Sequence, residues 1–142
     1  MSNLYPEVLL AHAKNPHGAG NVPRGTEDAE AINSGCGDEI RVKLYWTPDG
    51  TLGRLTHELR GCAVSAAAAS MAAKRLEGKT RAEIQTMAQA FAARLGRTGF
   101  EEAWGDFRAF NGIENYPARI HCAALVWQAV EQALAKDRPG KP

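Results

Sequence analysis

The chain has 142 residues, of which 44% are hydrophobic, and 17 Lys and Arg against 16 Asp and Glu leave a net charge of +1. A chain of this size is expected to form a single domain over residues 1–142 whose core needs no metal, so any bound metal would serve function. Nucleic-acid binders usually carry a large excess of Lys and Arg, and this chain has no such excess. The most apolar stretch, Ala63–Ala73, is only about half the ~20 residues that a membrane span requires. We therefore expect neither nucleic acid nor a membrane as a partner.

The first half of the chain predicts a short helix followed by a small antiparallel sheet. Tyr5–Lys14 has the apolar spacing of a helix and ends before Asn15-Pro16, and the glycine-rich residues 18–25 predict a loop. Alternating apolar residues predict a central strand, the turn residues Pro48-Asp49-Gly50 predict a hairpin, and a third segment adds an edge strand. The predicted strands are Glu27–Ile32, Glu39–Trp46 and Leu52–Leu59.

The second half of the chain predicts helices. The four segments with helical patterns are Ala63–Glu77, residues 81–95, Phe100–Phe110 and Pro117–Lys136. Gly78 is placed to end the first of them, and Thr80 with Glu83 has the spacing of a capping box for the second. Residues 137–142 are expected to form a short flexible tail. Strands followed by helices indicate the α+β class, with helices packed on a small three-stranded antiparallel sheet.

Three cysteines, Cys36, Cys62 and Cys122, are the most distinctive chemical groups of the sequence. Their odd number and wide spacing do not predict a disulfide framework, and the N-terminus has no signal-peptide pattern, so we expect free thiols in a cytoplasmic protein. Flanking glycines leave Cys36 uncrowded, and Asp38 points to the same side of an extended chain. Cys62 and Cys122 lie near predicted helix starts, where unpaired amides and the helix dipole favour a thiolate.

Spacing alone leaves two interpretations of the cysteines open. Three thiolates and one carboxylate would complete the tetrahedral ligand set of zinc, which accepts sulfur and oxygen donors. The other interpretation is that the cysteines are buried for structural reasons, as free cysteines commonly are. Because the chain has no Cys-x-x-Cys pair, spacing alone favours this structural interpretation. His121, beside Cys122, could be a ligand, a proton shuttle or an exposed residue at a helix start. His12, His17 and His57 have no clustered partners and are expected at the surface.

The sequences around the cysteines resemble the three cysteine motifs of the IscU/NifU-like superfamily of iron–sulfur cluster assembly proteins. These motifs are NSGCGDEI at residues 33–40, RGCAVSAAAASM at residues 60–71 and RIHCAAL at residues 119–125. The N-terminal LYPEVLL with the following KNP, and GKT at residues 78–80, also resemble that superfamily. The resemblance therefore extends over nearly the whole chain, and it implies the α+β fold of this superfamily.

Within the superfamily, the chain resembles the SufU group more than the IscU scaffolds. Residues 97–115 resemble the insertion typical of SufU, and residues 115–119 replace the Leu-Pro-Pro-Val-Lys segment by which chaperones recognise the scaffolds. Arg119 and Trp127 are also similar to residues of the SufU group. His121 departs from this pattern, because a histidine directly before the third cysteine is typical of the scaffold group.

The resemblance implies a zinc-dependent sulfurtransferase that accepts persulfide sulfur from a SufS-like cysteine desulfurase and supplies downstream iron–sulfur assembly proteins. The implied zinc ligands are Cys36, Asp38, Cys62 and Cys122. Cys36 would be the catalytic sulfur acceptor, with His121 and Arg119 as accessory residues. The alternative is a scaffold on which a [2Fe–2S] cluster is assembled on the same thiolates and then transferred, with His121 participating. A structural zinc domain without sulfur transfer is a third alternative.

Overall fold

The computed structural model describes residues 6–33 and 37–136. In chain order, its elements are α1 (Pro6–Lys14), β1 (Ala29–Asn33), β2 (Asp38–Trp46), β3 (Leu52–Arg60), α2 (Ala63–Leu76), α3 (Arg81–Ala93), the short helical segments η1 (Arg94–Thr98), η2 (Glu102–Phe110) and η3 (Ile113–Asn115), and α4 (Pro117–Lys136). These bounds agree closely with the predicted segments. The predicted helix start at Tyr5, the predicted site residue Cys36 and the predicted tail at 137–142 lie outside the described residues.

Within the described ranges, the strands form one antiparallel three-stranded sheet in the order β1-β2-β3, which confirms the predicted α+β class and hairpin. Ala31 pairs with Ile40 across β1 and β2, and Val42 pairs with His57 across β2 and β3. Because successive strand residues point to opposite faces, Ile40 and Val42 lie in the core while Arg41 lies on the other face. The sheet therefore offers one apolar face to the helices.

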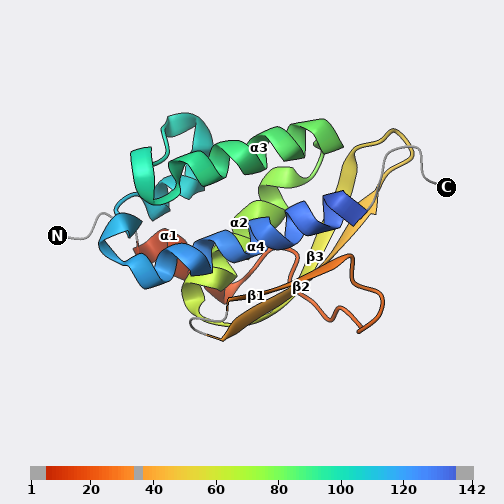
Figure 1. Ribbon diagram of the computed structural model, residues 1–142, viewed down its shortest axis with the longest axis horizontal. Coiled ribbons are helices and arrows are strands. Elements are labelled where there is room, and N and C mark those ends of the chain that lie inside the picture. Colours follow the sequence, from red (N-terminus) through yellow and green to blue (C-terminus); the bar gives the residue numbers. More distant parts are fainter. Residues whose placement is uncertain (1–5, 34–36, 137–142) are drawn as a thin grey trace.

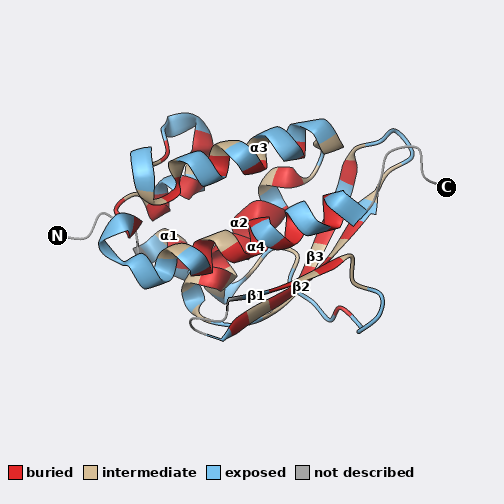
Figure 2. Cartoon of the chain, in the orientation of Figure 1, coloured by how far each residue is buried: buried red, intermediate tan, exposed pale blue. Residues whose placement is uncertain are grey.

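The helices cover this apolar face in layers (Figure 1). Helices α2 and α4 pack side by side on the sheet, α1 packs on α2, and α3 packs on α4. The sides of α2 and α4 that face their neighbours are buried, whereas the outward side of α3 is exposed (Figure 2). Helix α2 fits at the centre because its core positions are small, fully buried alanines: Ala67, Ala68, Ala69, Ala72 and Ala73. In the described ranges, no helix has the length and apolar character needed to cross a membrane.

Local sequence determines both ends of α2 and the start of α3. Cys62 occupies the N-cap position with an extended backbone, and its carbonyl accepts the N–H of Ala66 at 3.0 Å. Gly78, at a φ of 86°, follows the end of the helix as predicted. Thr80 and Glu83 form the predicted capping box of α3, because each side chain accepts the backbone N–H of the other. The second cysteine of the sequence is therefore held where β3 passes into α2.

Residues 97–115, the segment that resembles a SufU-type insertion, bring aromatic side chains into the core. The rings packed around Phe91 of α3 are Phe100, Trp104 and Phe107, with centroid distances of 5.2, 6.3 and 5.5 Å. Phe91 also stacks on Trp127 of α4 at a centroid distance of 4.7 Å. Such ring pairs add to the stability gained by burying their area. The segment therefore helps to fix α3 against α4, the helix that carries the third cysteine.

The expectation that His57 lies at the surface is wrong, because only 1% of this residue is exposed. Residues 18–20 run along the free edge of β3, where the N–H of His57 donates to the carbonyl of Gly18 and the N–H of Gly20 donates to the carbonyl of His57, each at 2.9 Å. The ring Nε2 of His57 donates to the carbonyl of His17 at 2.9 Å. A glycine-rich segment covers this histidine, and sequence periodicity gives no signal for such packing.

Burial of His57 predicts a loss of stability in acid. Desolvation of the ring lowers the pKa of His57 below its usual value, and its Nδ1 has no hydrogen-bond partner among the described residues. The unfolded chain therefore binds the proton more readily, so the free energy of unfolding should fall as the pH drops from about 6.5 toward the lowered pKa, by at most ~1.4 kcal/mol per pH unit. Urea denaturation at several pH values measures how the free energy of unfolding depends on pH. His57→Gln keeps a donor for the carbonyl of His17 and should reduce this pH dependence. An equal pH dependence in both proteins would contradict the prediction.

Candidate metal centre

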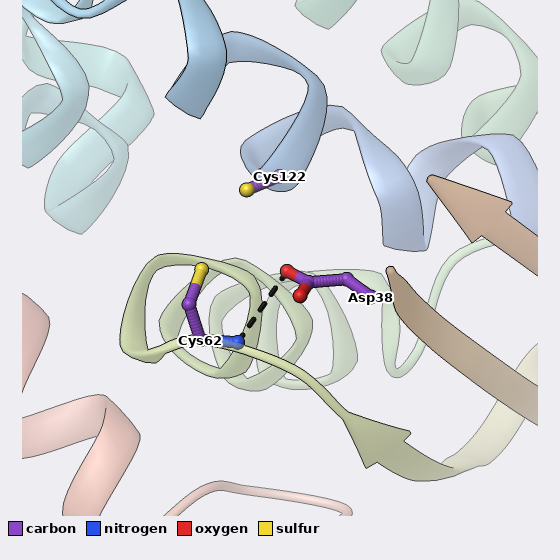
Figure 3. Close-up of side chains that lie close together, drawn as sticks. All are labelled: Asp38, Cys62 and Cys122. Carbon is purple, nitrogen blue, oxygen red and sulfur yellow. Dashed lines mark hydrogen bonds between the residues drawn. The ribbon is translucent and has the colours of Figure 1, made fainter. Parts of the chain in front are cut away.

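Three of the predicted ligands meet where β2, α2 and α4 begin (Figure 3). Asp38 is the first residue of β2, Cys62 directly precedes α2, and Cys122 lies near the start of α4. Each contributes one oxygen or sulfur atom, and these atoms all lie within 4.8 Å of one another. Over residues 6–33 and 37–136, no other group of three or more Cys, His, Asp or Glu side chains is arranged to hold a metal ion. The fold therefore gathers residues that are far apart in sequence into one candidate centre.

The carboxylate of Asp38 is buried, with 5% of the residue exposed, and it is fixed by hydrogen bonds and by close packing. Its Oδ2 accepts hydrogen bonds from the Ser65 hydroxyl at 2.5 Å and from the backbone N–H of Cys62 at 3.4 Å. Extending the pairing of β2 and β3 by one residue places Gly61 opposite Asp38. A Cβ atom at position 61 would lie only 2.7 Å from Cγ of Asp38. The site therefore needs a residue without a side chain at position 61.

The two described cysteines differ in exposure. Cys122 is fully buried, and its Sγ donates a weak hydrogen bond to the carbonyl of Ala118 at 3.7 Å. Cys62 is partly exposed at the N-cap of α2, and its Sγ lies 3.6 Å from Oγ of Ser65. Cys62 is the N-cap residue of α2, and Cys122 lies within the first two turns of α4, as predicted. The two sulfurs lie within 4.8 Å of each other and of a carboxylate oxygen of Asp38, which suits them to metal ligation.

Arg119 and His121, the two predicted accessory residues, differ in their relation to the ligand group. The guanidinium of Arg119 hydrogen-bonds the Cys122 side chain and lies beside Cys62, and these contacts raise the pKa of Arg119 above its usual value. Arg119 therefore places a permanent positive charge beside both sulfurs. His121 is exposed and does not belong to the group of ligand atoms. The structure thus places Arg119 against the sulfurs and leaves His121 outside the group.

The chemistry of the donor atoms fits zinc. Zinc takes four ligands in tetrahedral geometry, with thiolate sulfur at about 2.3 Å and carboxylate oxygen at about 2.0–2.2 Å, which puts ligand atoms roughly 3.3–3.8 Å apart. Atoms within 4.8 Å of one another need to close by only about 1 Å to meet this geometry. Two sulfurs and one oxygen leave room for a fourth ligand. Cys36, the predicted fourth ligand, lies outside the described residues.

Ser65 and Gly61 shape the centre but are not among the predicted site residues. Ser65 is 27 positions from Asp38 in the sequence, so its hydrogen bond exists only in the folded chain. The sequence does carry a weak signal. A glycine directly before Cys62 permits close approach of another side chain, and a serine three residues after it interrupts a helix start made otherwise of apolar residues.

A serine, a histidine and an aspartate also meet outside the metal centre. Nε2 of His12 donates to Oδ2 of Asp106 at 2.8 Å, and Nδ1 of His12 lies 2.7 Å from Oγ of Ser70. This order of groups resembles a hydrolase triad, but Ser70 is fully buried and also accepts the N–H of His17 at 2.9 Å. We interpret the cluster as a structural link between α1, α2 and η2. His12, expected at the surface, has only 13% of its side chain exposed.

Comparison with known proteins agrees with this fold. The family model of the NifU-like N-terminal domain matches residues 4–138. The zinc-dependent sulfurtransferase SufU of Bacillus subtilis is 32% identical over 142 residues, which cover 99% of this chain and 95% of that protein. The iron–sulfur cluster assembly scaffold protein IscU of Thermotoga maritima is 31% identical over 138 residues, which cover 96% of each chain.

Solved structures show the same architecture. A crystal structure from Fervidobacterium islandicum AW-1, of a candidate iron–sulfur cluster assembly scaffold protein for the SUF system, matches with a TM-score of 0.75 and 29% identity over 92% of this chain and 96% of that one. The chain belongs to the NifU-like N-terminal domain family. Its relatives are named for iron–sulfur cluster assembly and for zinc-dependent sulfur transfer, which confirms the resemblance carried by the cysteine motifs.

A substitution at Gly61 tests the close approach of Asp38. Gly61→Ala should lower the free energy of unfolding by about 1–3 kcal/mol, because the added methyl overpacks the buried carboxylate and displaces it. Urea denaturation of the metal-free protein measures the change. Gly20→Ala is the matched control, since a Cβ on Gly20 would meet no atom of the residues that the structure describes within 4 Å. If Gly61→Ala is as stable as Gly20→Ala, the close approach described here is wrong.

Proposed function

We propose that the protein is a zinc-dependent sulfurtransferase that takes persulfide sulfur from a cysteine desulfurase and supplies it for iron–sulfur cluster assembly. The convergence of Asp38, Cys62 and Cys122 within 4.8 Å, in a chain 32% identical to SufU, is the observation that carries this proposal. Cys36 is assigned as the fourth zinc ligand and as the sulfur acceptor. Two residues of chain span at most about 7 Å, so Cys36 is tethered within reach of Asp38.

The proposed transfer is a thiol–persulfide exchange. The thiolate of Cys36 attacks the terminal sulfur of the partner's cysteine persulfide, a new S–S bond forms on Cys36, and the partner's S–S bond breaks. The electron pair of the broken bond leaves with the cysteine thiolate of the partner, so no oxidant or reductant is consumed. Bound zinc would supply deprotonation of its cysteine ligands at neutral pH. In the sequence, Cys36 is flanked by two glycines, the residue type that best permits close approach of a partner.

Arg119 has a defined place in this proposal. Its guanidinium hydrogen-bonds Cys122 and lies beside Cys62, so it supplies a fixed positive charge to a site that holds anionic sulfur before and after transfer. His121 is exposed and outside the ligand group, which supports an accessory role at most. The downstream iron–sulfur assembly proteins would remove the sulfur from Cys36. A reducing cytoplasm, which keeps such thiols free, is the location that suits this chemistry.

A scaffold for a [2Fe–2S] cluster is the second candidate function, and the 31% identity with IscU favours it. Such a cluster would use the same thiolates. The two candidates differ in what the purified protein contains, because a sulfurtransferase is colourless with zinc, whereas a scaffold is coloured and carries iron with acid-labile sulfide. The resemblance of residues 97–115 to the insertion of SufU proteins supports the sulfurtransferase.

The sulfur acceptor can be identified by substitution and mass spectrometry. Cys36→Ala should abolish the stimulation of a cysteine desulfurase, because the attacking thiolate is missing. His121→Ala, which changes an exposed residue outside the ligand group, should keep most of the activity. After desulfurase turnover, peptide mass spectrometry should locate the additional sulfur on Cys36. Persulfide found only on Cys62 or Cys122 would refute the assignment of the acceptor.

A further inference from the structure

Building on the zinc site of the proposed function, we infer that Ser65 is a positioning residue that holds Asp38 as the oxygen ligand of the metal. Ser65 is the third residue of α2, and only 2% of it is exposed. Its Oγ lies 2.5 Å from Oδ2 of Asp38 and 3.6 Å from Sγ of Cys62. One buried hydroxyl therefore contacts two members of the ligand group without being a ligand itself.

The single proton of the Ser65 hydroxyl points to Asp38. A serine hydroxyl donates one hydrogen bond and accepts others, and a length of 2.5 Å is typical of a charge-assisted bond to a carboxylate. The lone pairs of Oγ remain available to the thiol of Cys62 at 3.6 Å. A buried carboxylate without such a donor would be costly, so this bond both satisfies Asp38 and fixes the rotation of its carboxylate group.

The start of α2 thereby orients the oxygen ligand. Ser65 donates from the first turn of the helix, the N–H of Cys62 donates from the N-cap position, and Gly61 leaves the space that the carboxylate occupies. Ser65 cannot shift easily, because the alanine face that follows it is fully buried against the core. Hydrogen-bond partners behind a metal ligand typically contribute roughly 10- to 100-fold to metal affinity, because they keep the ligand in its binding orientation.

Competition with a chromophoric chelator measures the zinc affinity without a desulfurase. Ser65→Ala should weaken zinc binding roughly 10- to 100-fold. Ser70→Ala is the matched control, because Ser70 lies on the same helix, is fully buried and hydrogen-bonds through its hydroxyl to His12 rather than to a ligand. The control should bind zinc like the unchanged protein. An equal loss in both variants would mean that the stability of α2 sets the affinity, and would overturn the inference.

The same substitution in an Asp38→Ala background tests whether Ser65 acts through Asp38. Ser65→Ala should then cause no further loss, and with Asp38 present it should shift the visible absorption of bound Co²⁺ toward that of Asp38→Ala. Unchanged zinc affinity in Ser65→Ala, or the same fold-loss without Asp38, would overturn the inference. A chain that binds zinc with the expected dependence on Ser65 but accepts no persulfide contradicts only the proposed function.

Discussion

A buried carboxylate has to be hydrogen-bonded, and this requirement on Asp38 organises the candidate metal centre. The residue is 5% exposed, and an ionised group at this depth is tolerated only with compensating donors. Those donors are the hydroxyl of Ser65 and the backbone N–H of Cys62, which both belong to the start of α2. The position of Asp38 at the start of β2 and the position of α2 after β3 are therefore coupled, and Cys62 is brought to the carboxylate as a consequence.

The remaining sulfur reaches the site through the packing of α4. Helix α4 lies on both the sheet and α2, and this packing brings the sulfur of the fully buried Cys122 within 4.8 Å of the ligand atoms of Asp38 and Cys62 (Figure 3). The aromatic cluster around Phe91 ties the segment at residues 97–115 to Trp127 of the same helix. The segment that resembles a SufU-type insertion thus contributes to the placement of the third cysteine as well as to the core.

Short-range sequence patterns predicted most of the fold, but they did not predict side-chain contacts between segments that are distant in the sequence. The alternation in β2, the turn before β3 and the capping box of Thr80 and Glu83 each depend on residues a few positions apart, so the sequence displays them directly. His57 is different, because its burial depends on a loop 40 positions away that covers the edge of β3. Ser65 is likewise invisible to periodicity, since its partner Asp38 lies 27 positions away.

The cysteine motifs, rather than spacing, predicted the ligand group. Spacing alone offered three thiolates and one carboxylate as a zinc ligand set but favoured buried structural cysteines, and the resemblance to the IscU/NifU-like superfamily reversed that preference. The structure brings Asp38, Cys62 and Cys122 together, whereas the role of Cys36 stays a prediction. Arg119 lies against the sulfurs of Cys122 and Cys62, and the accessory role that the resemblance implies for it likewise stays a prediction.

X-ray absorption spectroscopy at the zinc edge, on protein purified without added metal, tests the central claim most directly. A site formed by three cysteines and Asp38 predicts one zinc per chain with three sulfur neighbours at about 2.3 Å and one oxygen at about 2.0–2.2 Å. The scattering pattern of an imidazole ring would place a histidine in the fourth position and contradict the assignment of Asp38. Two sulfur neighbours would contradict the assignment of Cys36, and the absence of zinc would contradict the metal centre itself.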